Sequence, residues 1–548
     1  MELRDRTVVM LGGSGLVGQA VARRLLEWGP RRLVLVALAE DEVRAAARAL
    51  DRHRGGTRID VEWGNVFLPE SLARLDRAAI LADPGHRALV LGDLLGDLTE
   101  DVLGRSFLFR IIQRYRPDAV VDSINTATAF AYQDVFQSAR ELLAAARAGR
   151  ADAEEVERHL LTLTMPQLIR HLQIMVEALR RAGTQAYVKI GTSGTGGMGF
   201  NVPYTHSEER PSRTLLTKSA VAGAHSLLLF LMGRTPGAPA TIEIKPTATI
   251  AWREIAFGPV RRWRAPIPLV DCPEALPLDD AFAPGAAPWR DLGRPLEGVY
   301  IDVGENGLFA RDEFETVTSL GSMEFITPEE VADYVVMELT GRPTGRDIVA
   351  ALDAATAGPT YRAGILRSYA LDRLMALERE TGTRSIAYEM LGPPRLSKLL
   401  FEAQLCGLVR PSVRALAQSE PEELARDAYA AVCRDAALRR QMLSVGIPIL
   451  APDGRRVHRG RVVVVPPVEG DPVAAAPRGW VDLRPAQFGL WVRRGREMVA
   501  QAEARRSLAE ASGSDVEWTA IGADDPIAPA RFATWVFRYE DHGERIKR

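Results

Sequence analysis

Cysteine and net charge are both scarce in this chain of 548 residues. The three cysteines, Cys272, Cys406 and Cys433, stand far apart and form no C-x-x-C pair. Their spacing excludes a disulfide-stapled secreted fold and is typical of proteins in a reducing compartment. The 69 basic and 71 acidic residues nearly cancel, to a formal charge of -2. This balance gives no global field that would attract nucleic acid or an anionic membrane.

Long apolar runs are lacking as well. No run approaches the length of a membrane span, and the chain enters a strand pattern at Thr7, which leaves no room for a secretory signal. We therefore expect a cytoplasmic protein with no membrane span. The length allows about two to three domains.

Lysine is rare: five of the 69 basic residues are lysines, which leaves 64 arginines. A GC-rich genome explains such a bias without any functional reason. Where arginine has replaced lysine almost everywhere, however, each remaining lysine is a candidate for a site that needs a compact ammonium group. Three of the five, Lys189, Lys218 and Lys245, fall between residues 189 and 245.

The glycine-rich turn near the start of the chain is the most informative feature present. Thr7–Leu11 has the pattern of a buried parallel strand, and Leu16–Glu27 has that of an amphipathic helix. Glycines between them permit a tight turn, let the backbone approach a phosphate and let helix and strand pack closely. The helix N-terminus offers unpaired N–H groups to the anion. This arrangement predicts a dinucleotide site.

The spacing of the glycines fits two related patterns. Gly12, Gly15 and Gly18 give G-x-x-G-x-x-G, whereas Gly13, Gly15 and Gly18 give G-x-G-x-x-G. Both patterns indicate nucleotide binding in preference to a merely structural turn.

Further strands alternate with helices along the first half of the chain. We expect a strand over Arg32–Leu38, an inserted stretch over Thr57–Arg87 and a third strand over Ala88–Leu94. A fourth strand starts at Pro117 and ends in small polar residues, and two more follow over Ala186–Gly191 and Ala240–Ile244. This alternation predicts an α/β fold with a doubly wound, Rossmann-like parallel sheet.

The region from 346 to 548 is predicted to be a mostly helical extension. Helices are expected over 344–382, 393–443 and 485–507, with a small β-hairpin whose turn is Asp453-Gly454 and whose second strand is Arg461–Val465. Arginines at 361–367 and 393–398 fit either a clamp for a substrate anion or solvated helix faces. The segment is equally compatible with an oligomerisation surface, so a homo-oligomer stays open.

The order of the motifs resembles the extended short-chain dehydrogenase/reductase family, which includes nucleotide-sugar epimerases and dehydratases. The resemblance spans about residues 1–345 and rests on these motifs: the Gly12/Gly15/Gly18 turn, Gly92-Asp93-Leu94, the P-D-x-V-V strand before Asn125, Thr192-Ser193, Pro203-Tyr204, Glu208-Glu209, Lys218, Lys245-Pro246, Gly298–Gly304 and Thr327–Ala332. It implies a Rossmann-like domain over 1–260, with insertions near 57–87 and 135–165, and a substrate-side segment over 261–345.

The resemblance implies NAD or NADP as the cofactor. Gly12, Gly15 and Gly18 would hold the diphosphate together with their neighbours Ser14 and Leu16. The other expected cofactor contacts are Glu40 at the ribose, Asp93 and Leu94 at the adenine, Asn125 and Lys218 at the nicotinamide riboside, and Pro246.

The catalytic residues implied by the resemblance depart from the family pattern at one position. The family places a tyrosine four residues before the lysine, where this chain has Thr214 before Lys218. A threonine hydroxyl is far less acidic than a phenol, so it cannot take that role. Tyr204 is the preferred substitute, with His206 as the alternative, and Ser193 or Thr192 is expected to hydrogen-bond the reacting oxygen.

These observations favour an NAD(P)-dependent oxidoreductase that acts on a hydroxyl or carbonyl carbon of a small molecule. A nucleotide-sugar epimerase or dehydratase with transient hydride transfer is the first alternative. The second is a non-catalytic dinucleotide sensor or scaffold, which the Thr214 substitution would permit. No group of histidine, cysteine and carboxylate residues has the spacing of a metal site.

Overall fold

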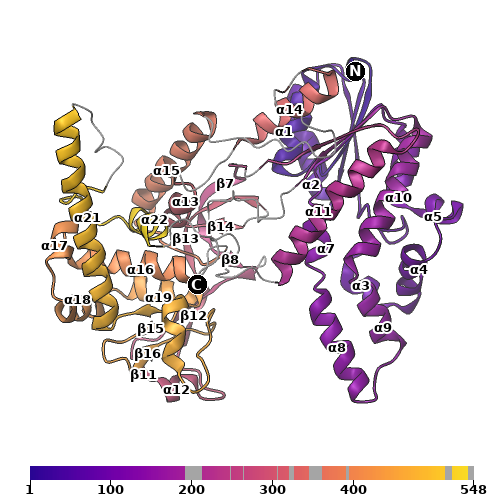
Figure 1. Ribbon diagram of the computed structural model, residues 1–548. Helices are drawn as coiled ribbons and strands as arrows, with labels where there is room; N and C mark the ends of the chain where they lie inside the picture. Colours follow the sequence, from indigo (N-terminus) through magenta and orange to yellow (C-terminus); the bar gives the residue numbers. More distant parts are fainter. Residues whose placement is uncertain are drawn as a thin grey trace. The chain divides into compact units, whose positions relative to one another are not determined.

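The computed structural model describes residues 1–191, 213–246, 249–262, 265–304, 307–319, 326–342, 344, 361–390, 394–512 and 521–540. The chain divides into two compact units (Figure 1). Unit 1 draws on the segments Met1–Phe200, Pro211–Ala251 and Glu324–Gly364, and unit 2 on Asn201–Arg210, Trp252–Met323 and Ile365–Arg548. The chain therefore leaves unit 1 after Ala251 and returns to it before it completes unit 2.

A six-stranded parallel sheet forms the centre of unit 1, in the order β3-β2-β1-β4-β5-β6. The strands are Thr7–Leu11 (β1), Arg32–Ala37 (β2), Arg58–Trp63 (β3), Ala119–Asp122 (β4), Ala186–Ile190 (β5) and Ala240–Ile244 (β6). The strand order reverses between β1 and β4, which is the switch point of the Rossmann fold. The predicted doubly wound α/β fold is confirmed.

The third strand lies elsewhere than predicted. β3 belongs to the stretch that was expected to be an insertion, and it pairs in parallel with β2. Residues 88–94, expected to be the strand, lie inside helix α4 (Pro84–Leu95). Asp83 caps this helix by accepting from the N–H of His86 at 2.8 Å, and Pro84 takes its first position, where no N–H is needed. The inserted helices therefore follow β3 instead of preceding it.

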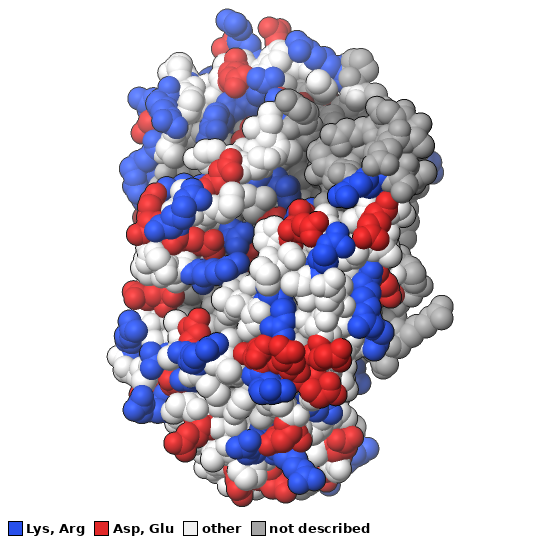
Figure 2. Space-filling model, turned by 90° about the vertical axis from the view of Figure 1, so that its left-hand side faces the viewer, with Lys and Arg blue, Asp and Glu red and all other residues white. Residues whose placement is uncertain are grey.

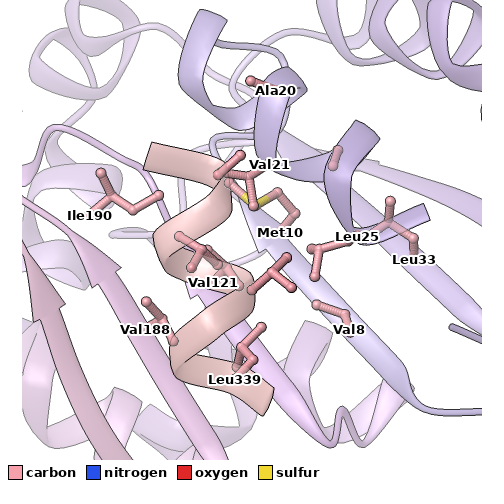
Figure 3. Close-up of a cluster of buried hydrophobic side chains, with 14 of the residues drawn as sticks. Val8, Met10, Ala20, Val21, Leu25, Leu33, Val121, Val188, Ile190 and Leu339 are labelled. Carbon is pink, nitrogen blue, oxygen red and sulfur yellow. The ribbon is translucent and has the colours of Figure 1, made fainter. Parts of the chain in front are cut away.

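Helices cover both faces of the sheet. One face packs against α1 (Leu16–Leu26), α2 (Glu40–Leu50) and α14 (Pro328–Thr340). Figure 3 shows this cluster, in which Val8, Met10, Val121 and Val188 from the strands lie among Val21, Leu25 and Leu339 from the helices. The other face packs against α6 (Phe107–Tyr115), α10 (Thr164–Ala182) and α11 (Arg213–Arg234). Each fully buried leucine or valine in these layers contributes about 1.5–3 kcal/mol to folding.

Helix α11 contains a segment, Leu216–Arg234, that is long and apolar enough to cross a membrane by length and composition. The expectation that no run approaches such a length is therefore wrong. In the structure, Val221, Ala222, Leu229 and Met232 of this helix are buried in the core of unit 1. A core helix of a folded domain passes the same test, so the segment is weak evidence for a span.

The remaining described helices of unit 1 lie between its strands in the sequence. They are η1 (Asp51–His53), α3 (Arg77–Ala82), α5 (Glu100–Arg105), α7 (Thr126–Ala131), α8 (Val135–Arg147) and α9 (Ala153–Leu160).

Small sheets lie in unit 2, and they are antiparallel except for the parallel pairing of β15 with β17. Their strands are β7 (Glu254–Pro259), β8 (Arg261–Arg262), β9 (Ala265–Pro266), β10 (Pro268–Asp271), β11 (Leu276–Pro277), β12 (Arg290–Pro295), β13 (Glu297–Asp302), β14 (Leu308–Phe309), β15 (Ile449–Leu450), β16 (Arg456–His458) and β17 (Val481–Asp482). The predicted hairpin around Asp453-Gly454 joins β15 to β16. Its second strand is Arg456–His458 and not Arg461–Val465, because the Asp453 carboxylate accepts the N–H groups of Arg455 and Arg456 and turns the chain early.

Helices dominate the rest of unit 2. They are α12 (Leu278–Phe282), α13 (Arg311–Val317), α15 (Tyr361–Thr381), α16 (Pro394–Val409), α17 (Val413–Ala417), α18 (Pro421–Arg434), α19 (Ala436–Val445), η4 (Pro472–Ala475), α20 (Ala476–Gly479), α21 (Pro485–Ser512) and α22 (Pro529–Tyr539). The predicted helix over 393–443 is thus four shorter ones. Figure 2 shows acidic and basic side chains intermixed over the described part of one face, in keeping with the small net charge.

A buried ion pair anchors the helical part of unit 2. The Lys398 ammonium contacts the Glu402 carboxylate one turn along α16, and both side chains are almost fully buried. Glu402 also accepts from the Asp482 N–H, the Gln487 amide and the Trp491 indole, at 2.8–2.9 Å. The rare Lys398 is therefore part of a hydrogen-bonded core cluster, which is how buried charges are tolerated.

Two buried carboxyl groups, Glu313 and Glu389, meet at the start of α13. Glu313 accepts from the backbone N–H groups of Ala310 and Glu389, both at 2.9 Å. Burial raises the pKa of Glu313 to about 7 and the pKa of Glu389 to about 8. Glu389 has a φ of 59°, in the left-handed region, and its Oε1 atom has no hydrogen-bond partner among the described residues.

The raised pKa values predict a loss of stability as the pH rises. Both groups keep their protons longer when folded than when unfolded, so the free energy of unfolding falls from about pH 4.5 up to the folded pKa values, by at most about 1.4 kcal/mol per pH unit for each carboxyl. Glu313→Gln removes one of these protons and should flatten the fall up to about pH 7. Urea unfolding of wild type and variant at several pH values measures this, and equal slopes would contradict the assignment.

Candidate functional site

The glycine turn lies at the centre of the carboxyl edge of the unit 1 sheet, between β1 and α1. The N–H groups of Gly12 and Gly13 both donate to the Val36 carbonyl, at 2.9 and 3.0 Å. Gly12 has a φ of +77°, and a Cβ there would lie 2.7 Å from the Ser123 Oγ. A Cβ on Gly18 would collide with the Gly12 carbonyl oxygen. Packing alone therefore requires glycine at both positions.

Gly15 is different, because packing does not require a glycine there. Its φ is -70°, which any residue adopts, and a Cβ would come no closer than 3.4 Å to a neighbouring atom. Gly15 is the N-cap of α1 and gives the helix no side-chain cap. The first N–H groups of the helix, which begins at Leu16, thus face outward without the usual side-chain acceptor. This bare positive end fits a diphosphate that approaches close to the backbone.

The first turn of α2, which follows β2, contains three acidic residues. Glu40 pairs with Arg44 on the same helix, with 2.8 Å between Oε1 and Nε. Glu42 reaches the glycine turn, where the Ser14 Oγ lies 3.4 Å from its Oε2. Glu40 was the predicted ribose contact, whereas the acid that reaches the glycine turn is Glu42. The run Glu40-Asp41-Glu42 was the available signal, but only the helix geometry shows which acid turns toward Ser14.

Asp93 and Leu94 do not follow a strand. Both lie on α4, where the Asp93 carboxylate accepts from the Arg105 Nε at 2.7 Å and Leu94 is buried. The residues that follow β3 are Gly64, Asn65 and Val66. They have the same order of glycine, polar and apolar residues as Gly92-Asp93-Leu94. The pattern that was expected after the third strand therefore occurs at two places in the sequence.

The loop after β4 lies next to the glycine turn. The Ser123 Oγ donates to the carbonyls of Leu11 and Gly12, at 3.0 and 3.2 Å. Two residues on, Asn125 is the N-cap of α7, where its side chain accepts from the Thr128 N–H at 3.2 Å. Asn125 is thus held at the switch point, and its role at the nicotinamide riboside stays a prediction.

The buried ammonium group of Lys189 contacts the loop after β4. The Lys189 ammonium on β5 lies 3.0 Å from Asp122 Oδ1, 2.7 Å from the Ile124 carbonyl and 3.2 Å from the Thr126 Oγ1. Three acceptors match its three protons. Tyr187 donates to the other Asp122 oxygen at 2.8 Å, and both Lys189 and Asp122 are almost fully buried. Lys189 is therefore a positioning residue for the loop that presents Asn125.

Lys218 lies on α11 and is buried, with only 7% of its surface exposed. Thr214 precedes it by one turn on the same helix, so the two positions share a face. Lys245 and then Pro246 follow the end of β6. The Lys245 ammonium lies 3.4 Å from the buried Glu243 carboxylate. Thr192, Ser193, Tyr204 and His206 lie outside the described residues. Within the described residues, no group of three histidine, cysteine or acidic side chains has the geometry of a metal site.

The Lys189 network predicts a large cost for removing its cation. Lys189→Met leaves the buried Asp122 carboxylate without its ion pair and should lower the free energy of unfolding of unit 1 by about 3–5 kcal/mol. Arg44→Met, which breaks the exposed pair with Glu40, is the control and should cost at most about 1 kcal/mol. Denaturant unfolding measures both variants. Similar losses of unfolding free energy in the two variants would contradict the role of Lys189 as a positioning residue.

The C-terminal half of the chain matches a known family. Residues 269–541 match the family model described as "Beta-methylindole-3-pyruvate reductase C-terminal domain".

The curated relatives that match are much longer proteins. A phenolphthiocerol/phthiocerol polyketide synthase of Mycobacterium tuberculosis is 31% identical over 119 residues, and the match covers 21% of this chain and 5% of the synthase. The match therefore spans only a small part of that enzyme.

Solved structures of dehydrogenases and reductases are similar at low sequence identity. A short-chain dehydrogenase/reductase from Mycobacterium ulcerans is 15% identical, with a TM-score of 0.31, over 68% of this chain and 99% of that one. An alcohol dehydrogenase from Thermococcus sibiricus is 16% identical, with a TM-score of 0.27, over 65% of this chain and 97% of that one.

The fold assignment follows from the strand order and the glycine turn. The chain combines a Rossmann-like parallel sheet with a region, residues 269–541, that matches the model of a reductase C-terminal domain.

Proposed function

We propose that this chain is an NAD(P)-dependent reductase of the extended short-chain type, which acts on a carbonyl carbon. The observation that carries the proposal is Gly15, a glycine that packing does not require, at an uncapped helix N-terminus on the switch point of the sheet. The family match of residues 269–541 to a reductase domain supports the same reading. In the cell, we place this reductase in the cytoplasm.

Different residues at the carboxyl edge of the sheet would bind different parts of the coenzyme. The first-turn amides of α1, with Ser14 and Leu16 beside them, would bind the diphosphate, and Glu42 or Glu40 the adenosine ribose. Asn125 and Lys218 would hold the nicotinamide riboside. A bound nicotinamide coenzyme supplies or accepts a hydride.

The proton has to come from a group other than Thr214. Tyr204 is our choice for the acid, because a phenol whose pKa is lowered by a nearby ammonium exchanges protons near neutral pH. Ser193 or Thr192 would donate to the carbonyl oxygen as negative charge builds on it. Pro246 would line the nicotinamide end of the site.

A 2-oxo acid with an aromatic side chain is the substrate class that we propose. The family matched by residues 269–541 is named for the reduction of β-methylindole-3-pyruvate, which belongs to this class. The arginine-rich composition provides ample partners for a substrate carboxylate.

A protein that binds the dinucleotide without turning it over is the second candidate. The specific observation in its favour is Thr214 at the position of the family's acid. An epimerase or dehydratase would use the same site but would return the hydride to its substrate, with no net change in nicotinamide absorbance.

Gly15→Val tests the coenzyme site without disturbing the fold. The backbone at Gly15 is compatible with valine and its surroundings are open, so the thermal midpoint should stay nearly unchanged. The added side chain would block close approach of the diphosphate, so the Kd for NADH and NADPH should rise at least about tenfold, or about 1.4 kcal/mol. Calorimetry with each coenzyme measures this. Gly92→Val, on open helix surface, is the control, and an unchanged Kd in Gly15→Val would contradict the site.

Tyr204→Phe tests the proton donor. With NADH or NADPH and indole-3-pyruvate, kcat should fall about 10²- to 10⁴-fold while the coenzyme Kd is retained. Thr214→Tyr, which restores the family pattern above Lys218, should recover part of this loss when combined with Tyr204→Phe. Full activity of Tyr204→Phe would exclude Tyr204. Tight coenzyme binding by the wild type with no change in nicotinamide absorbance would favour the non-catalytic reading.

A further inference from the structure

A cavity of about 290 Å³ lies inside unit 1, on the face of the sheet covered by α6 and α10. The loop after β3, the inserted helices α3 and α4, and helices α6, α7 and α10 all contribute to its wall. The inserted helices and the turn before them provide Leu75, Arg77, Ile80, Leu81, Val90, Asp93 and Leu94. The insertion that follows β3 thus helps to enclose this space.

The cavity wall is mainly apolar. Phe67, Leu108, Phe130, Leu161 and Ile174 contribute aromatic and branched side chains from other segments. The rings of Phe67 and Phe130 lie 4.8 Å apart, and the ring of His171 meets Phe67 edge-on at 4.7 Å. An apolar wall of this kind suits a hydrophobic or aromatic body.

Polar atoms that have no hydrogen-bond partner among the described residues lie in the same wall. His171 is 5% exposed, and its Nε2 atom is buried without a hydrogen-bond partner. Beside it on α10, Nε and Nη1 of Arg170 are also buried and unpaired. Buried polar atoms without partners cost about 1–3 kcal/mol each unless a ligand or water satisfies them. They are therefore polar atoms that a bound ligand can satisfy.

The charges in the wall that no carboxylate of the wall pairs with are positive. Arg170 and Arg77 are cations, and burial lowers the pKa of Arg77. The one acidic group that the described residues contribute to the wall, Asp93, is already engaged by Arg105, which neutralises it. Burial lowers the pKa of His171 to about 4, so its ring is neutral at pH 7 and can donate or accept one hydrogen bond.

We propose that this cavity binds a small amphiphilic anion, with an aromatic or aliphatic body against Phe67 and Phe130 and a carboxylate on Arg170 and His171. The carboxylate would accept from the unpaired nitrogens of Arg170. The volume is near the lower end of ligand pockets, so one ring or a medium acyl chain fits it. The inference does not depend on the proposed catalytic function.

Calorimetry with 4-phenylbutyrate and octanoate on the full chain tests the proposal. We expect at least one of the two to bind with one site per chain, and 4-phenylbutan-1-ol, which lacks the carboxylate, to bind at least tenfold more weakly. Arg170→Met should raise the Kd at least tenfold. Arg180→Met, which removes an exposed arginine from the same helix, should leave it unchanged. No binding of either acid to the wild type at millimolar concentration would overturn the proposal.

A second variant keeps the test independent of the arginine. Val90→Phe fills the cavity from α4 and should abolish binding, whereas Ala88→Phe on the exposed face of the same helix should not. Thermal unfolding checks that both variants are folded.

Competition with the coenzyme separates this site from the sheet edge. The acid should still bind to Gly15→Val and in the presence of saturating NADPH. Mutually exclusive binding would overturn a separate site and would assign the cavity to the adenine end of the coenzyme, through Asn65, Asp93 and Leu94.

Discussion

The close approach of α1 to the end of β1 is the constraint on which unit 1 depends. Gly18 lies against the Gly12 carbonyl, and Gly12 lies against Ser123 at the end of β4, so the switch point holds no side chain between its three segments. This contact places the N-terminus of α1 at the carboxyl edge of the sheet. The packing that stabilises the domain therefore also creates the surface on which an anion can rest.

Buried charged groups occur in two kinds of arrangement in this chain. In unit 1 the Lys189 ammonium and the Asp122 carboxylate satisfy each other together with hydroxyl and backbone partners, so the charges fix a loop. In unit 2 the Glu313 and Glu389 carboxyl groups lie together, and burial favours their protonated forms. The first arrangement fixes the loop after β4, and the second makes the local structure sensitive to pH.

The fold class and the glycine turn could be predicted because both depend on local patterns. The third strand could not: β3 is an edge strand with half-exposed residues, whereas Ala88–Leu94 is an apolar run that suits a strand or a helix equally well. Asp83-Pro84 was the helix start signal that decides between them. The role of Lys189 could not be predicted from the sequence either, because Asp122 reaches Lys189 only through the pairing of β4 with β5.

The return of the chain to unit 1 has a consequence for its biosynthesis. Helix α14 covers one face of the sheet with Val331, Val335 and Leu339, yet it is translated after the Trp252–Met323 segment of unit 2. Until the ribosome has released residue 340, Val8, Val121 and Val188 have no cover from that helix. The nascent domain is therefore exposed to aggregation and to chaperones for longer than a contiguous domain would be.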